Sequence, residues 1–338
     1  MKPVSIVIAV TYGCNSRCLT CDIWQMERGQ ELDPGSYERL PASLRYINIS
    51  GGEPFMREDL FDVVSVIKRR CPESHIIIST NGLLPDRVER MMKKMTWVGV
   101  RVSLDAVGSE DDRVRGIPGS FEKAMQTIDV LRGIGVEDLG VSATISRHNP
   151  GGALAVKKYA ERENLEFSSV VAHSGPLYFG DKRGSSPDPE VAERELLEIR
   201  NNELSSMNVK AWFRAYYTDG LIDYAKGLPR RIRCYGGRIA IYLTPGGDVY
   251  PCNILPDRMG NILEDSYETI ASHSKAIFEK VDSCPVQCWM SCTVAPVMRL
   301  NPFKPLLWAL RTKFFGRNGY EAWRESQAPE ENHVHTGG

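Results

Sequence analysis

Residues 11–24 of the chain read TYGCNSRCLTCDIW and hold three cysteines, Cys14, Cys18 and Cys21. The stretch directly follows an apolar run, residues 4–10, that predicts a buried strand. Three thiolates on one short loop can wrap a soft metal centre, whereas a structural zinc site or an ordinary iron–sulfur cluster takes four ligands. Two interpretations follow: a cluster with one iron open to a small molecule, or a zinc loop whose fourth ligand lies elsewhere.

Polar or glycine-rich motifs follow three more strand-like runs, residues 46–49, 76–78 and 97–102. The motifs are Ser50-Gly51-Gly52-Glu53-Pro54, Ser79-Thr80-Asn81-Gly82 and Ser103-Leu104-Asp105. In a parallel α/β barrel the carboxyl ends of the strands meet on one face, where the active site forms. A zinc loop needs no such arrangement, so the pattern favours a catalytic centre.

Helix signals alternate with these strands at residues 33–44, 59–70, 85–94, 121–132 and 153–163, and further strands are expected at 140–146 and 167–172. Six such units predict an α/β fold, a partial (β/α)6 TIM-like barrel over residues 1–185. Residues 186–232 are expected to form a connecting helical segment. It holds a charged helix at 190–204 and an aromatic-rich stretch at 212–224 that packs between domains.

The Cys14, Cys18 and Cys21 spacing, residues 51–54 and the order of the later motifs resemble the radical S-adenosylmethionine superfamily. The resemblance covers roughly the first half of the chain. It implies that the three cysteines are catalytic and hold a 4Fe–4S cluster, whose fourth iron binds the amino and carboxylate groups of S-adenosylmethionine. One departure is Thr20, because many members have an aromatic residue before the third cysteine.

The resemblance also implies a set of residues that bind S-adenosylmethionine. Residues 51–54 would meet the methionyl amino group, and Ser103 and Asp105 would lie near the ribose or the methionyl carboxylate. Arg115 could clamp a carboxylate with its guanidinium fork, with surface ion pairing as the alternative. The full set is Gly51, Gly52, Glu53, Pro54, Thr80, Asn81, Ser103, Asp105 and Arg115.

A second group of cysteines lies within residues 233–300. Residues 239–251 predict a β-hairpin with a glycine turn that brings Cys234 and Cys252 to the same end. The region resembles the auxiliary-cluster domain of many radical S-adenosylmethionine enzymes, called SPASM with two clusters and twitch with one. Five cysteines favour a small α+β domain with one auxiliary 4Fe–4S cluster, and a zinc ribbon is the alternative. The ligands would be Cys234, Cys252 and two of Cys284, Cys288 and Cys292, which leaves one thiol idle or reactive.

Composition narrows the setting of the protein. Eight of the nine cysteines belong to the two groups, which favours a reduced, cytoplasmic location, and only Cys71 stands apart. The net charge of −1 gives no indication of nucleic-acid binding. Residues 301–317 are basic and aromatic, so we expect either peripheral contact with a membrane surface or a docked terminal helix. The tail from residue 327 is expected to be disordered.

The resemblance implies that an external one-electron reductant, such as flavodoxin or ferredoxin, starts the removal of a hydrogen atom from substrate. Peptide-modifying members often carry an N-terminal leader-binding domain, whereas this chain begins at its first strand. We therefore expect a small-molecule substrate: a sugar, an aminoglycoside-like compound or a cell-envelope glycan or lipid precursor that is oxidised, epimerised or rearranged. The alternatives are a maturase or activating enzyme acting on a peptide or protein, and a non-catalytic iron–sulfur or zinc scaffold.

Overall fold

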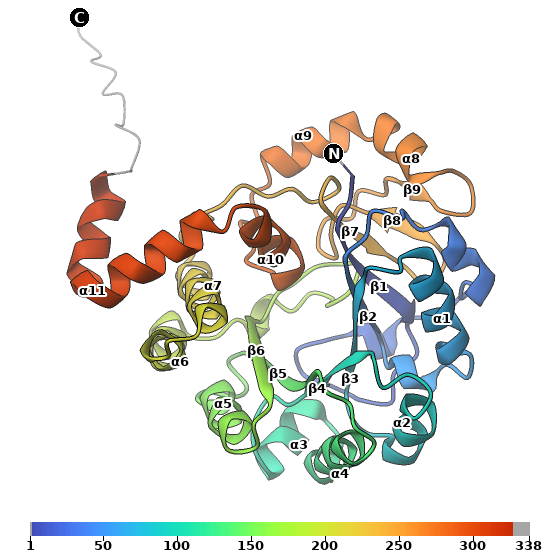
Figure 1. Ribbon diagram of the computed structural model, residues 1–338, viewed down its shortest axis with the longest axis horizontal. Helices are drawn as coiled ribbons and strands as arrows, with labels where there is room; N and C mark the ends of the chain where they lie inside the picture. The colour runs from blue at the N-terminus through green and yellow to red at the C-terminus, as the bar shows by residue number, and fades with distance from the viewer. Residues whose placement is uncertain (1, 327–338) are drawn as a thin grey trace, which may run out of the picture.

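The computed structural model describes residues 2–326, and within them one sheet of nine strands has the order β6-β5-β4-β3-β2-β1-β7-β8-β9. The first six strands pair in parallel and curve into an open half-barrel (Figure 1). The predicted partial barrel is therefore confirmed. These strands are β1 Ser5–Thr11, β2 Tyr46–Gly51, β3 His75–Thr80, β4 Gly99–Ser103, β5 Leu139–Ile145 and β6 Glu166–Val171.

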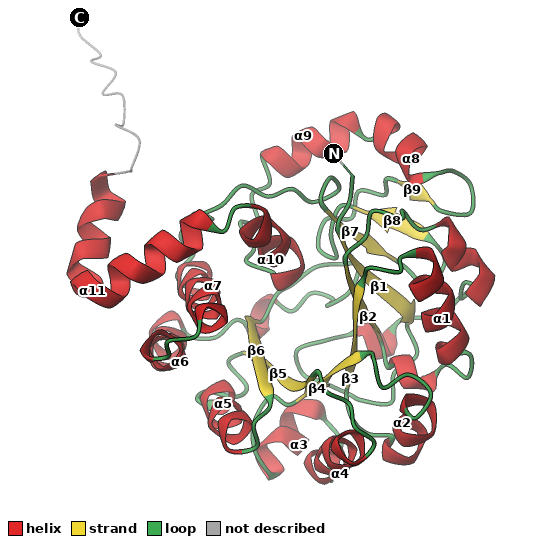
Figure 2. Ribbon diagram, in the orientation of Figure 1, coloured by secondary structure: helices red, strands yellow, loops and turns green. Residues whose placement is uncertain are grey.

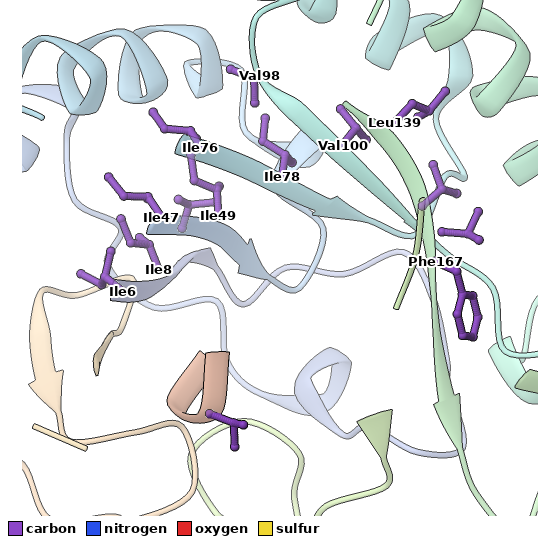
Figure 3. Close-up of a cluster of buried hydrophobic side chains, with 14 of the residues drawn as sticks. Ile6, Ile8, Ile47, Ile49, Ile76, Ile78, Val98, Val100, Leu139 and Phe167 are labelled. Carbon is purple, nitrogen blue, oxygen red and sulfur yellow. The ribbon is translucent and has the colours of Figure 1, made fainter. Parts of the chain in front are cut away.

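Helices cover the outer face of the half-barrel (Figure 2). The inner face carries a separate group of buried side chains. Ile6 and Ile8 of β1 join the outer core, shown in Figure 3, and Val7 and Ala9 join the inner group. Because both faces are buried, the strands read as continuous apolar runs in the sequence. The covering helices are α1 Leu60–Arg70, α2 Pro85–Met92, α3 Ser109–Arg115, α4 Ser120–Gly133 and α5 Gly152–Arg162.

The helix predicted at residues 33–44 is wrong in type and length. The chain forms a 3-10 helix, η2 Pro34–Arg39, whose first turn is capped by the Asp33 carboxylate. The next residue, Leu40, is extended and precedes a proline, a position that disfavours helical backbone. Three more 3-10 turns lie at Ile23–Gln25, Pro54–Met56 and Arg183–Ser185.

The predicted hairpin is confirmed as β7 Ala240–Leu243 and β8 Asp248–Tyr250, followed by β9 Gly260–Asn261. The sequence did not predict that β7 pairs in parallel with β1, from Ser5–Ala240 to Ile8–Leu243. The C-terminal region therefore extends the barrel sheet (Figure 1). Helices α8 Tyr267–His273, α9 Lys275–Asp282 and α10 Ser291–Leu300 follow, and α10 packs against β1, β7 and α7.

Two long helices, α6 Pro189–Ser205 and α7 Val209–Ala225, form the connecting segment and pack against each other. The last helix, α11 Phe303–Ser326, packs on α7 and bends at Gly316. Its Trp308 is buried, and its ring centre lies 5.4 Å from that of Tyr216 in an edge-to-face arrangement, which supports the docked-helix interpretation of this segment. No helix within residues 2–326 is long and apolar enough to cross a membrane. The tail predicted to be disordered from residue 327 lies outside the described residues.

Gly220 in α7 makes room for the buried ring of Trp289, because a Cβ at this position would lie 2.1 Å from a ring carbon. Replacing a mid-helix glycine by alanine ordinarily stabilises a helix. Here we expect Gly220→Ala to lower the free energy of unfolding by about 1–3 kcal/mol, because the overpacked ring must move.

Chemical denaturation under anaerobic conditions checks this expectation. Gly133→Ala in α4 is the matched control, since a Cβ there meets nothing within 4 Å. The control should be neutral or stabilising by up to about 1 kcal/mol. Equal stability of the two variants would contradict the packing of Trp289 against α7.

Candidate active site

The three-cysteine loop is pressed against the end of β2, backbone to backbone. The Gly52 N–H donates to the Thr11 carbonyl and the Glu53 N–H to the Gly13 carbonyl, each at 2.8 Å. A Cβ at Gly51 would lie 2.3 Å from the Thr11 oxygen, and one at Gly52 would lie 2.1 Å from the Gly13 oxygen. Only glycine fits so close an approach. The paired glycines therefore set the position of the cysteine loop.

The end of α3, a helix that the sequence did not predict, holds the other side of the loop. The Arg17 N–H donates to the Arg115 carbonyl at 3.0 Å, and the Leu19 N–H donates to the Val114 carbonyl at 2.9 Å. Gly116 follows in a left-handed conformation, and a Cβ there would lie 2.4 Å from the Arg17 oxygen. Backbone hydrogen bonds thus hold the loop on both sides.

Cys14, Cys18 and Cys21 line one cavity at the carboxyl edge of the parallel strands. Six of the predicted cofactor-binding residues line it as well: Gly51, Gly52, Thr80, Asn81, Ser103 and Arg115. The structure therefore brings together the ends of β1 to β4, as the parallel arrangement predicts. Glu53, Pro54 and Asp105 lie outside the lining.

Glu53 is fully buried behind the cavity wall and connects two strand ends. One carboxylate oxygen accepts hydrogen bonds from the Phe55 N–H at 3.1 Å and the Thr80 hydroxyl at 2.9 Å, and the other accepts from the Asn81 N–H at 2.7 Å. Burial raises the pKa of Glu53, while these donors oppose the rise. The carboxylate positions β2 against β3, and its predicted contact with a methionyl amino group stays a prediction.

The Asp105 carboxylate connects the end of β4 to β5 in a similar way. One oxygen accepts from the Thr144 N–H at 2.7 Å and the other from the Arg115 guanidinium at 3.1 Å. The Arg115 side chain is only 11% exposed, so its ion pair is not the surface pair considered from the sequence. Burial lowers the pKa of Arg115, but Cys18 and two aspartates outweigh burial and raise it. Arg115 therefore stays charged at the cavity wall.

The three thiols suit a cationic cluster. Burial raises the pKa of Cys14 to about 11 and that of Cys21 to about 12, and the neighbouring thiols add to both shifts. Cysteine ligands bind metal as thiolates, so bound iron would supply the positive charge that stabilises three buried thiolates. Within residues 2–326, no three His, Cys, Asp or Glu side chains are grouped as the ligands of a single ion. A 4Fe–4S cluster spreads its thiolate ligands over several irons, so three thiols that line one cavity suit a cluster.

A second cavity is lined by Cys234, Cys252, Cys284 and Cys288. Burial raises the pKa of Cys252 to about 12 and that of Cys288 to about 11, with Arg230 opposing the shift at Cys288. Four thiols around one small cavity suit a fully ligated 4Fe–4S cluster. Cys292, on α10, is not part of this lining, but it packs against the hydrophobic cluster that holds Cys252 and Cys288, and beside Tyr178 and Tyr242. Which four of the five thiols hold the auxiliary cluster stays a prediction.

His173 was missed in the sequence, although it follows β6 by two residues and lines the first cavity. Its Nδ1–H donates to the Val171 carbonyl, and its buried Nε2 has no partner among the described residues. Burial lowers the pKa of His173 to about 4, so the ring is neutral. The ring stacks on Tyr224 at 4.3 Å. The strand-end rule that selected the other motifs would also have found this residue.

Tyr178 closes the cavity beside the cysteine loop and was likewise missed. Its hydroxyl bonds to the Ser50 hydroxyl at 2.7 Å and donates to the Gly51 carbonyl at 3.0 Å, while its own carbonyl accepts from the Cys21 thiol at 3.7 Å. No sequence signal points to this residue, because it lies in the loop after β6. It joins the end of β2 to the third cysteine.

Each of the two groups of cysteines lies in a region that matches a known protein family. Residues 8–147 match the Radical SAM superfamily, and residues 234–293 match the SPASM iron–sulfur cluster-binding domain. The chain is 27% identical over 282 residues to the mycofactocin maturase MftC of Mycobacterium ulcerans, covering 78% of this chain and 72% of the relative. It is 26% identical over 294 residues to the AdoMet-dependent heme synthase of Nitratidesulfovibrio vulgaris, covering 77% and 76%.

A solved structure shows the same fold. Native anSMEcpe with bound AdoMet and a peptide superposes with a TM-score of 0.61 at 17% identity, covering 82% of this chain and 83% of the other. These matches confirm the predicted cofactors, S-adenosylmethionine and iron–sulfur clusters.

The pH dependence of stability tests whether His173 is buried and neutral in the cavity wall. Below pH 6.5 the unfolded chain binds a proton at this histidine, whereas the folded chain does so only near pH 4. The free energy of unfolding should therefore fall as the pH is lowered through this window. His173→Phe keeps a ring on Tyr224 and should remove about 3 kcal/mol of that fall. Denaturant titrations from pH 7 to 4, at equal cluster content, measure it, and identical slopes would contradict a buried neutral His173.

Proposed function

Because the chain belongs to the radical SAM superfamily and carries a SPASM iron–sulfur domain, we propose that it is a maturase that uses S-adenosylmethionine to modify a peptide. One observation carries this proposal: three thiols share a cavity with the motifs of β2, β3 and β4. A maturase among its relatives and a peptide-bound structural neighbour support the substrate class.

When bound, the cluster and S-adenosylmethionine supply a 5′-deoxyadenosyl radical that removes a hydrogen atom from a C–H bond. Cys14, Cys18 and Cys21 would hold the cluster. Gly51 and Gly52 offer backbone groups at close range, since a side chain at either position would collide with the cysteine loop. Among the described contacts, the Arg115 side chain donates to Asp105, and its other N–H groups suit a carboxylate.

The other half of the cavity is the place for the substrate. It is lined by Thr144, Val170, Val171, His173, Tyr178 and Phe179, from β5, β6 and the loop that follows. The neutral Nε2 of His173 can accept a hydrogen bond from a substrate N–H or O–H group. The apolar neighbours exclude water from the reacting carbon. Tyr224, behind His173, packs against the second cysteine cavity, so the substrate half faces the auxiliary cluster.

A second candidate substrate is a tetrapyrrole, favoured by the heme synthase that matches over a comparable length. The sugar, aminoglycoside-like and envelope substrates expected from the sequence have no counterpart among the three named proteins. An external one-electron reductant such as flavodoxin or ferredoxin is part of either proposal.

Removing the three thiols distinguishes the contribution of the first cluster from that of the auxiliary cluster. In the triple variant Cys14→Ala, Cys18→Ala, Cys21→Ala we expect iron to fall from about eight to about four per chain, since one 4Fe–4S cluster remains. Formation of 5′-deoxyadenosine from S-adenosylmethionine and dithionite should drop to background. Cys71→Ala is the control, because this buried cysteine lies apart from both cavities. Cleavage that survives in the triple variant would refute the proposed cluster site.

The substrate class is tested by cell extract added to the reconstituted enzyme, with 5′-deoxyadenosine as the readout. A peptide substrate predicts that extract raises the yield and that prior protease treatment abolishes the increase. Stimulation that resists protease would reject the peptide and favour the tetrapyrrole. Mass spectrometry of the stimulating fraction would then identify the product.

A further inference from the structure

Three arginines precede the first auxiliary cysteine, Cys234, and two of them are neutralised. Arg231 pairs with two aspartates of α7. Arg233, on the surface, pairs with Asp282 at 3.0 Å. Among the described residues, Arg230 forms no ion pair with a carboxylate.

The Arg230 guanidinium faces one of the auxiliary thiols. Its Nη1 donates to the Cys288 carbonyl at 2.7 Å and lies 3.8 Å from the Cys288 sulfur, within hydrogen-bonding distance for sulfur. Further bonds to the Thr293 hydroxyl and carbonyl, at 3.3 Å, hold the fork in place. The guanidinium carbon lies 5.7 Å from the centre of the Trp289 ring, whose position is fixed against α7. The cation is therefore held rigidly beside a thiol.

We propose that Arg230 is a positioning residue that raises the affinity of the auxiliary cluster for an electron. A reduced cluster carries one more negative charge than an oxidised one, so a fixed cation with an N–H···S bond stabilises the reduced state more. The inference rests on the proposed function only in requiring an auxiliary cluster that has Cys288 among its ligands.

Among the described residues, the first site has no cation bonded to a cysteine sulfur. Arg17, in the cysteine loop, is exposed and donates to the Cys14 carbonyl at 3.1 Å. Arg115 lies near Cys18 but shares its charge with Asp105, and Asp111 lies nearby. The two sites therefore differ in whether a half-buried cation donates to a thiol.

A redox titration followed by electron paramagnetic resonance tests the proposal. The protein lacking Cys14, Cys18 and Cys21 leaves only the auxiliary cluster to be seen. Adding Arg230→Gln should lower its midpoint potential by about 59 mV or more, which is a tenfold loss of electron affinity for a one-electron couple. Arg230→Lys keeps the charge but loses the fork, so its potential should lie between the two.

Arg233→Gln is the matched control. It removes the same charge three residues away, at a side chain that is 61% exposed and paired with Asp282, so solvent screens its effect. We expect its potential to stay within a small fraction of the Arg230→Gln shift. An equal shift in the control would mean that net charge alone matters and would overturn the role of Arg230.

Iron content separates the remaining outcomes. An Arg230→Gln protein that holds the cluster at an unchanged potential overturns this inference and leaves the proposed function intact. Loss of the cluster in both Arg230 variants shows a purely structural role and overturns it as well. If the protein with Arg230 intact binds no auxiliary iron, the proposed function loses its second cluster too.

Discussion

The contact between two stretches of backbone, residues 11–13 and 51–53, is the constraint on which the site depends. Two N–H groups of the β2 end donate to carbonyls of the cysteine loop, and no side chain fits between them. This contact ties the loop to the one edge of the sheet where the parallel strands end. The thiols consequently face the same cavity as the side chains of β3 and β4. A looser loop would leave three cysteines on a surface.

Charge is arranged in two layers around each set of thiols. The inner layer consists of the thiols themselves. Burial raises the pKa of Cys14, Cys21, Cys252 and Cys288, so these thiols stay protonated until a metal cation binds. The outer layer differs between the sites. Behind the first lie two buried carboxylates, Glu53 and Asp105, that join neighbouring strands through backbone N–H groups. Beside the second, Arg230 donates to the Cys288 carbonyl and lies 3.8 Å from the Cys288 sulfur.

The sequence predicted what local pattern controls. Apolar runs that end in polar motifs located six strands and most of the cavity, because parallel strands place their carboxyl ends together. Thiol spacing identified the two groups of cysteines that line the two cavities. The pairing of β7 with β1 joins residues more than 200 apart, so no local signal reports it. Helix α3 is short and highly charged, which hides it from hydrophobic periodicity.

The sequence identified residues of the site more readily than it indicated what their side chains do. Glu53 and Asp105 were found by motif, but their hydrogen bonds to backbone depend on the distance between strands and appear only in three dimensions. The sequence could not show that Cys292 packs against Cys252 and Cys288 from α10 while Cys284 lines the second cavity, because both placements depend on the tertiary fold. His173 obeys the same strand-end rule as the motifs and could have been predicted.

The central claim is that the first cluster has one iron without a protein ligand, open to S-adenosylmethionine. Electron paramagnetic resonance of the reduced protein, recorded with and without S-adenosylmethionine, measures this directly. The signal that disappears when Cys14, Cys18 and Cys21 are replaced belongs to the first cluster. The account predicts that S-adenosylmethionine changes the shape of that signal. A signal that stays the same, or a protein that binds zinc at these cysteines, would contradict it.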